Sequence, residues 1–192
     1  MKTVNRGRWL LLILLAGCSQ EKKSTEKYFD FDGLIDNQIS QLSQRMRVLE
    51  KITEMSGISS DTTFLPSVKG WGSELEIFRQ LEIINKPIYR EVYKVEDPVE
   101  DPNSNLKIRY YAAASAPVPS IKFYYQNEFS NLKKIEAVIH EKNILYTTQR
   151  QLVIEFDEEE GERLIARYGM KGFQKMIFRD TVRFSVQGQI DW

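Results

Sequence analysis

Alternating apolar and polar residues run through the second half of this 192-residue chain and constrain its fold more than any other feature. A strand presents successive side chains to opposite faces of a sheet, so this alternation predicts strands that are buried on one face. It is clearest over residues 106–112, 121–125 and 135–140. Weaker patterns predict further strands near 88–95, 145–156, 164–170, 173–178 and 181–190.

The segments between these strands are short. Residues 126–131 and 141–143 are polar and turn-forming, and they leave no room for a crossover helix. Neighbouring strands are therefore expected to pair as antiparallel hairpins. Residues 157–160 are expected to form a brief helical turn.

Two helices are expected before the strands. Asp32 could cap the first, whose apolar stripe has helical spacing and consists of Ile35, Ile39, Leu42, Met46 and Leu49. Residues 56–70 are expected to form a loop. Ser73 and Glu76 then match a capping box for a second helix, which Pro87 would end. Its buried face would carry Trp71, Leu75, Phe78 and Leu81.

These elements predict an α+β fold, in which two N-terminal helices pack on a curved antiparallel β-meander. A sheet with one apolar face needs such a cover. About 170 residues suit a single domain with a sizeable core.

The first residues look like a targeting segment. Lys2, Arg6 and Arg8 precede an apolar run that ends at Leu15, and small residues follow. This order is that of a secretory signal peptide, and the run is far shorter than the ~20 residues that span a bilayer. The stretch Leu15-Ala16-Gly17-Cys18 resembles the lipobox of bacterial lipoproteins.

That resemblance implies cleavage before Cys18 and acylation of its thiol, palmitate included. It divides the chain into a signal peptide (1–17), a lipidated tether (18–27) and a single α+β domain (28–192). The expected location is the bacterial cell envelope, with the domain lipid-anchored to a membrane. Ser19 after the cysteine is compatible with sorting to the outer membrane.

Charge and cysteine content exclude several classes of function. The chain has 27 basic and 27 acidic residues, and removal of residues 1–17 leaves 24 basic groups and a net charge near −3. Nucleic-acid binding, which needs a clustered basic surface, is therefore not expected. Acylation of the single cysteine would also leave no thiol for a disulfide, a thiolate metal site or a nucleophile.

Few residues are candidates for catalysis or metal binding. His140 is the single histidine and is expected on the polar side of a strand. The acidic loop from Asp97 to Asn105 partly resembles a calcium loop, with Asp101, Asn103 and Asn105 at the first ligand positions, but the required glycine and bidentate glutamate are missing. The acidic segment 157–162 reads as a charged turn. We expect no enzyme, cofactor or metal site.

The main functional hypothesis is thus an envelope lipoprotein that acts as a non-enzymatic binding or docking module for a protein or an apolar ligand. The alternative is a carbohydrate-binding accessory lipoprotein. It depends on Tyr111 and Tyr124, which are expected to face out from adjacent strands and could stack on a glycan. A third possibility, an enzyme with a carboxylate pair, would need two carboxylates that face each other in a pocket.

Overall fold

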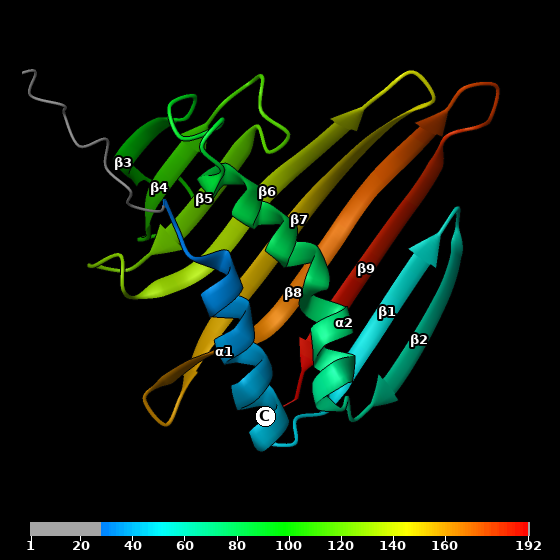
Figure 1. Ribbon diagram of the computed structural model, residues 1–192. Coiled ribbons are helices and arrows are strands. Elements are labelled where there is room, and N and C mark those ends of the chain that lie inside the picture. The colour runs from blue at the N-terminus through cyan, green and yellow to red at the C-terminus, as the bar shows by residue number, and fades with distance from the viewer. Residues whose placement is uncertain (1–27, 192) are drawn as a thin grey trace, which may run out of the picture.

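A computed structural model describes residues 28–191, and these residues form a nine-stranded antiparallel sheet with helices on one face (Figure 1). The strand order is β2-β1-β9-β8-β7-β6-β5-β4-β3. The strands are β1 (Leu49–Met55), β2 (Ile58–Phe64), β3 (Lys94–Glu100), β4 (Lys107–Ala112), β5 (Ser120–Tyr125), β6 (Leu132–Lys142), β7 (Tyr146–Glu159), β8 (Glu162–Met176) and β9 (Val182–Ile190).

The antiparallel meander is confirmed from β3 to β9, since each strand pairs with the next one along the chain. The first hairpin, β1–β2, then joins the free edge of β9 in antiparallel register. The pairing of Leu49 with Ile190 joins the first strand of the chain to the last. This long-range pair completes the sheet.

Helices α1 (Phe31–Gln44) and α2 (Val68–Arg79), with the short 3-10 helix η1 (Gln80–Asn85), lie across one side of the sheet (Figure 1). We call this side the helix face and the opposite side the open face. Trp71, Leu75, Phe78 and Leu81 are buried against the helix face, so the predicted apolar side of the second helix is confirmed.

The positions of the helices differ from the prediction. Only α1 precedes the strands, and the β1–β2 hairpin separates it from α2. The expected stripe breaks after Leu42, because α1 ends at Gln44 and Met46 has a left-handed φ of 49° and is exposed. Leu49 is buried in the same core, but from β1.

Both helix starts also lie before the predicted ones. Asp30, not Asp32, caps α1, and its Oδ1 accepts from the Gly33 amide at 3.2 Å. Ser67 caps α2, six residues before Ser73, and its hydroxyl accepts from the Gly70 amide.

Three strand predictions need correction. The predicted strand at 88–95 is mostly turn, and β3 begins at Lys94. The two strands expected at 164–170 and 173–178 are one strand, β8. The helical turn expected at 157–160 is instead a tight hairpin, in which Glu160 and Gly161 have φ values of 52° and 80°. Two consecutive positive φ values are typical of a two-residue hairpin turn.

The core lies between the helices and the sheet. Its aromatic part begins at Phe29 and Phe31, whose rings lie 4.7 and 5.9 Å from the ring of Phe123 on β5. Tyr111 and Phe129 contact Phe123 edge-on from opposite sides of this cluster. The entrance of the chain into the domain is thus fixed by ring packing.

Candidate functional site

The open face is the part of the sheet that the described helices leave uncovered. Its side chains follow from the register, because Tyr168 points to the helix face, where its hydroxyl donates to Glu74 on α2 at 2.8 Å. The alternating neighbours Arg167 and Gly169 must then point to the open face. Gly169 pairs with Gln187 on β9 and Val153 on β7.

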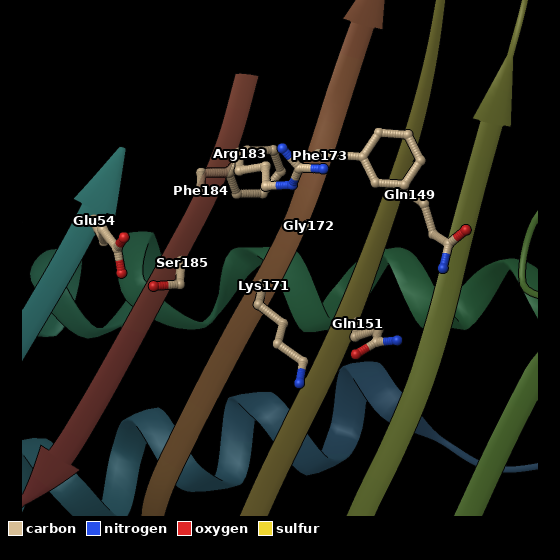
Figure 2. Close-up of a pocket in the computed structure, with 9 residues that line it drawn as sticks. All are labelled: Glu54, Gln149, Gln151, Lys171, Gly172, Phe173, Arg183, Phe184 and Ser185. Atoms are coloured by element: carbon tan, nitrogen blue, oxygen red, sulfur yellow. The ribbon is translucent and has the colours of Figure 1, made fainter. Parts of the chain in front are cut away.

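A hollow of about 740 Å³ lies along this face over β2, β1, β9, β8 and β7. A smaller hollow of about 370 Å³ adjoins it toward the ends of the strands, and the two share Gln151, Lys171 and Ser185. Figure 2 shows the smaller one from the open face, with the helices behind the sheet. Together they form one groove that crosses five strands.

Amides and hydroxyls line much of this groove. Open-face lining side chains without charge include Gln149, Gln151, Gln187, Gln189, Ser185 and Thr63. Each amide both donates and accepts hydrogen bonds, so the groove can bind a backbone or another polar ligand in several orientations.

Charges in the groove are separated by sign. Glu50, Glu54 and Asp61 lie on the β1–β2 side, whereas Arg167 and Lys171 lie on β8 and Arg183 lies on β9. Arg167 is ion-paired with Glu155 on β7, with Nε 2.7 Å from Oε2, and Lys171 remains exposed. A ligand that spans the groove would meet acidic groups at one side and a basic group at the other.

Glycine contributes to the depth of the groove. A Cβ at Gly169 would meet the Val186 carbonyl at 3.6 Å, an ordinary contact, so a Cβ fits there without a clash. At Gly172 on the same strand, a Cβ would lie 2.2 Å from the Gln149 carbonyl. Gly172 is therefore required by close backbone packing, whereas Gly169 leaves space that the hollow occupies.

The structure does not expose the two tyrosines of the predicted ligand face. Tyr111 points to the helix face and is 3% exposed, with its ring against Tyr28 and Phe123. Tyr124 lies on the open face as expected but is 6% exposed. The expectation that they face solvent is wrong, because ring packing buries the first and charged neighbours cover the second.

Tyr124 is held by those neighbours. Its hydroxyl donates to Glu136 Oε2 at 2.7 Å, and the Lys134 ammonium lies 4.0 Å from its ring centroid. Burial, followed by this bond to a carboxylate, raises the pKa of Tyr124 well above its usual range. The pKa of Glu136 is lowered overall: burial is the largest influence and opposes the shift, but the bonds from Lys134 and Tyr124 outweigh it. This cluster stabilises the sheet.

The other residues considered in the sequence analysis bind neighbouring protein groups or are exposed. Asp101 accepts from the Ser104 hydroxyl at 2.6 Å and from the Asn103 amide, and the hydroxyl bond lowers the pKa of its carboxyl. Asp97 is bound by Arg109 and Tyr125. His140 is exposed on β6. Among residues 28–191, no group of three or more histidine, cysteine or acidic side chains is placed to hold a metal ion.

Cys18, the signal peptide and the tether lie outside the described residues. No helix within residues 28–191 is both long and apolar enough to cross a bilayer. The lipid anchor therefore stays a prediction from the sequence.

The groove was not predicted from the sequence. A signal for it was present in the alternating glutamines of Gln149-Arg150-Gln151 and Gln187-Gly188-Gln189, which place two amides of each strand on the same face. The strand order brings these amides into one groove, because β7 and β9 pair with β8 on its two sides.

Comparison with known proteins gave no match: no family model matches the chain, and no curated protein or solved structure is significantly similar to it.

Proposed function

We propose that this chain is a non-enzymatic lipoprotein of the bacterial cell envelope, anchored through Cys18, whose open-face groove docks a segment of a protein partner. The observation that carries the docking proposal is the groove itself, an uncovered hollow of about 740 Å³ across five paired strands. Its rigid strands hold the lining side chains in fixed positions, as a preformed binding surface requires.

The lining combines amides and charges with the apolar side chains of Ile52 and Val153, a mixture that suits a polypeptide better than a wholly apolar ligand. Amides of β7 and β9 can pair with peptide N–H and C=O groups, and the separated charges of Glu54 and Lys171 would fix the direction of a bound segment. The groove also reaches Asp61 and Thr63 of β2. This edge strand has seven exposed residues and pairs with β1 alone, so a partner strand could add to it.

The carbohydrate alternative loses the feature that motivated it, because Tyr111 and Tyr124 are buried. A protein partner therefore remains the better proposal.

The docking proposal is tested by site-specific photocrosslinking in intact cells. A benzophenone amino acid replaces Gln187 inside the groove, and a second chain carries it at the exposed Ser104 as a control. We expect a defined crosslinked product from position 187 and none from position 104. Equal products from both positions would contradict docking in the groove.

Filling the groove supplies the specificity test. Gly169→Leu should abolish the crosslink from position 187, because its side chain occupies the hollow. The matched control is Gly72→Leu on α2, where a Cβ would meet nothing within 4 Å. Both variants should retain the thermal midpoint of the parent. A crosslink that persists in Gly169→Leu would exclude the groove as the docking site.

The anchor is tested separately by metabolic labelling with palmitate, fractionation and protease treatment of intact cells. We expect label and membrane retention in the wild type and the loss of both in Cys18→Ala. Digestion from outside would place the domain at the cell surface, and protection would place it in the periplasm. An unlabelled wild type would refute the lipoprotein assignment while leaving the groove proposal intact.

A further inference from the structure

Three hairpin tips meet at one end of the sheet, where β6–β7, β8–β9 and β1–β2 turn (Figure 1). They are bonded to one another, since the Ile177 amide donates to the Leu145 carbonyl and the Ser56 amide donates to the Arg183 carbonyl. We call this continuous edge the tip edge.

The tip edge carries an unusual amount of exposed apolar surface. Phe178 is 102% exposed, Ile144 88% and Ile58 77%, and Leu145, Met55 and Ile177 are exposed beside them. Large aliphatic and aromatic side chains at the ends of rigid hairpins cannot reach the protein core, and their grouping marks an interaction surface. Phe178 also has a left-handed φ of 61°, a costly backbone conformation for an aromatic residue.

Basic residues surround these apolar tips. Lys142, Lys175, Arg179 and Arg183 are exposed there, against Asp180 and Glu54. Nearby Glu141 is ion-paired with Arg150. Apolar groups at the tips and cations just behind them match the acyl boundary and the anionic headgroups of a phospholipid surface.

The opposite end of the sheet has the opposite character. The β7–β8 turn carries Asp157, Glu158, Glu159, Glu160 and Glu162. Arg45 and Arg47, just past α1, both lie against Glu159, and Arg163 lies in register with Glu158, so this end carries a small excess of acidic side chains. An anionic membrane would repel this end and attract the tip edge, which orients the domain with its strands upright.

The length of the tether is compatible with this orientation. The described chain starts at Tyr28, whose ring packs on Tyr111, and Tyr111 lies in register with Ala137 of β6 through Ile121. Seven further residues of β6 and its turn reach Ile144, about 24 Å along the strand direction. Ten residues, Cys18 to Lys27, can span at most about 34 Å. An acylated Cys18 and the tip edge can therefore lie in the same membrane plane.

We propose that the tip edge contacts the surface of an anionic phospholipid membrane, with Ile144, Leu145, Ile177 and Phe178 in the headgroup region. The proposal rests on the lipid anchor of the proposed function. In this orientation the open face stands perpendicular to the bilayer plane, and its groove stays free for a partner.

The test uses the mature acylated chain in vesicles of phosphatidylethanolamine and phosphatidylglycerol. Because the single native cysteine is acylated, Ile144→Cys and Phe178→Cys each supply one thiol for a nitroxide, and Glu158→Cys at the acidic end is the control. We expect the ratio of oxygen to nickel-chelate accessibility to be at least tenfold higher at the tips than at position 158. Ratios within twofold of the control would overturn the proposal.

Failure of the anchor gives a different result. Cys18 would then accept a nitroxide in the parent chain. In that case, membrane contact by the tip edge is tested by co-sedimentation of the unacylated chain with the same vesicles. At least tenfold weaker binding of the Ile144→Ser/Phe178→Ser variant supports the membrane contact, and equal binding overturns it.

Discussion

The side-chain amide of Gln38 on α1 pairs with the backbone of β8 as a neighbouring strand would. Its Oε1 accepts from the Ile165 amide at 2.7 Å, and its Nε2 donates to the Arg163 carbonyl at 2.9 Å. The pairing of β7 and β8 skips Ala166 here, which is the extra residue of a β-bulge. Gln38 is 1% exposed, so no solvent could replace these bonds.

Asn85 binds backbone groups in the same way at the start of the domain. Its Oδ1 accepts from the Tyr28 amide at 2.8 Å and its Nδ2 donates to the Phe29 carbonyl at 2.7 Å. Two buried amides thus hold irregular backbone against the core, one at the bulge and one at the first described residues.

Replacing Gln38 by leucine should destabilise the domain by about 2–4 kcal/mol, because a buried N–H and a buried C=O both lose their partner. Gln44→Leu on the exposed side of α1 is the matched control and should change stability by less than about 0.5 kcal/mol. Urea denaturation of both variants measures the difference. Equal stabilities would show that water or a backbone shift satisfies β8 without the amide.

Alkaline pH should destabilise the fold through buried tyrosines. Burial raises the pKa of Tyr93 from its ordinary 10.0 to about 12, and its hydroxyl donates to the Val118 carbonyl at 2.7 Å. Below pH 10 the hydroxyl is protonated in both states. Between pH 10 and 12 the unfolded chain ionises first, so stability falls with rising pH.

Tyr93→Phe is the variant that isolates this effect. It should lower stability at pH 8 by about 1 kcal/mol through the lost hydrogen bond, yet show a shallower fall between pH 10 and 12. Denaturant midpoints at pH 8, 10 and 11.5 provide the measurement. A parallel loss in variant and wild type would assign the alkaline transition to other groups, of which Tyr168 is the first to test: burial and then its bond to Glu74 raise its pKa.

The meander could be predicted from the sequence because alternation is a local property of each strand. The helix boundaries could not. Leu49 continues the helical spacing of Leu42 and is buried in the same core, but it belongs to β1, so the apolar pattern does not record where the helix ends. The segment 58–64 reads as a loop because every residue of this edge strand is exposed.

The groove depends on contacts that no local pattern contains. Ile52 of β1 pairs with Gln187 of β9, which lies more than a hundred residues later in the chain. This pairing places the acidic side of the groove opposite β8. The prediction that the tyrosines face solvent was wrong for a related reason. The alternation over residues 106–112 grouped Tyr111 with the charged Lys107 and Arg109, which predicted that it faces solvent, whereas Tyr111 faces the core.

Two glycines three residues apart on β8 should respond to alanine in opposite ways. At Gly172 a Cβ would lie 2.2 Å from the Gln149 carbonyl and 3.2 Å from the Arg150 Cα, so the backbones of β7 and β8 must separate. We expect Gly172→Ala to cost about 1–3 kcal/mol. Gly169→Ala meets one ordinary contact, at 3.6 Å, and should leave stability unchanged or raise it by up to about 1 kcal/mol, since alanine restricts the unfolded chain.

Thermal and urea unfolding of these two variants also decide whether the groove can be filled without damage. A destabilised Gly169→Ala would mean that the floor of the hollow is as tightly packed as the strand contact at Gly172, and Gly169→Leu would then block docking through misfolding. A stable Gly169→Ala beside a destabilised Gly172→Ala would instead show that close strand contact demands glycine at one position, while at the other glycine leaves open a space that the fold does not need. That space is the one in which we propose that a partner binds.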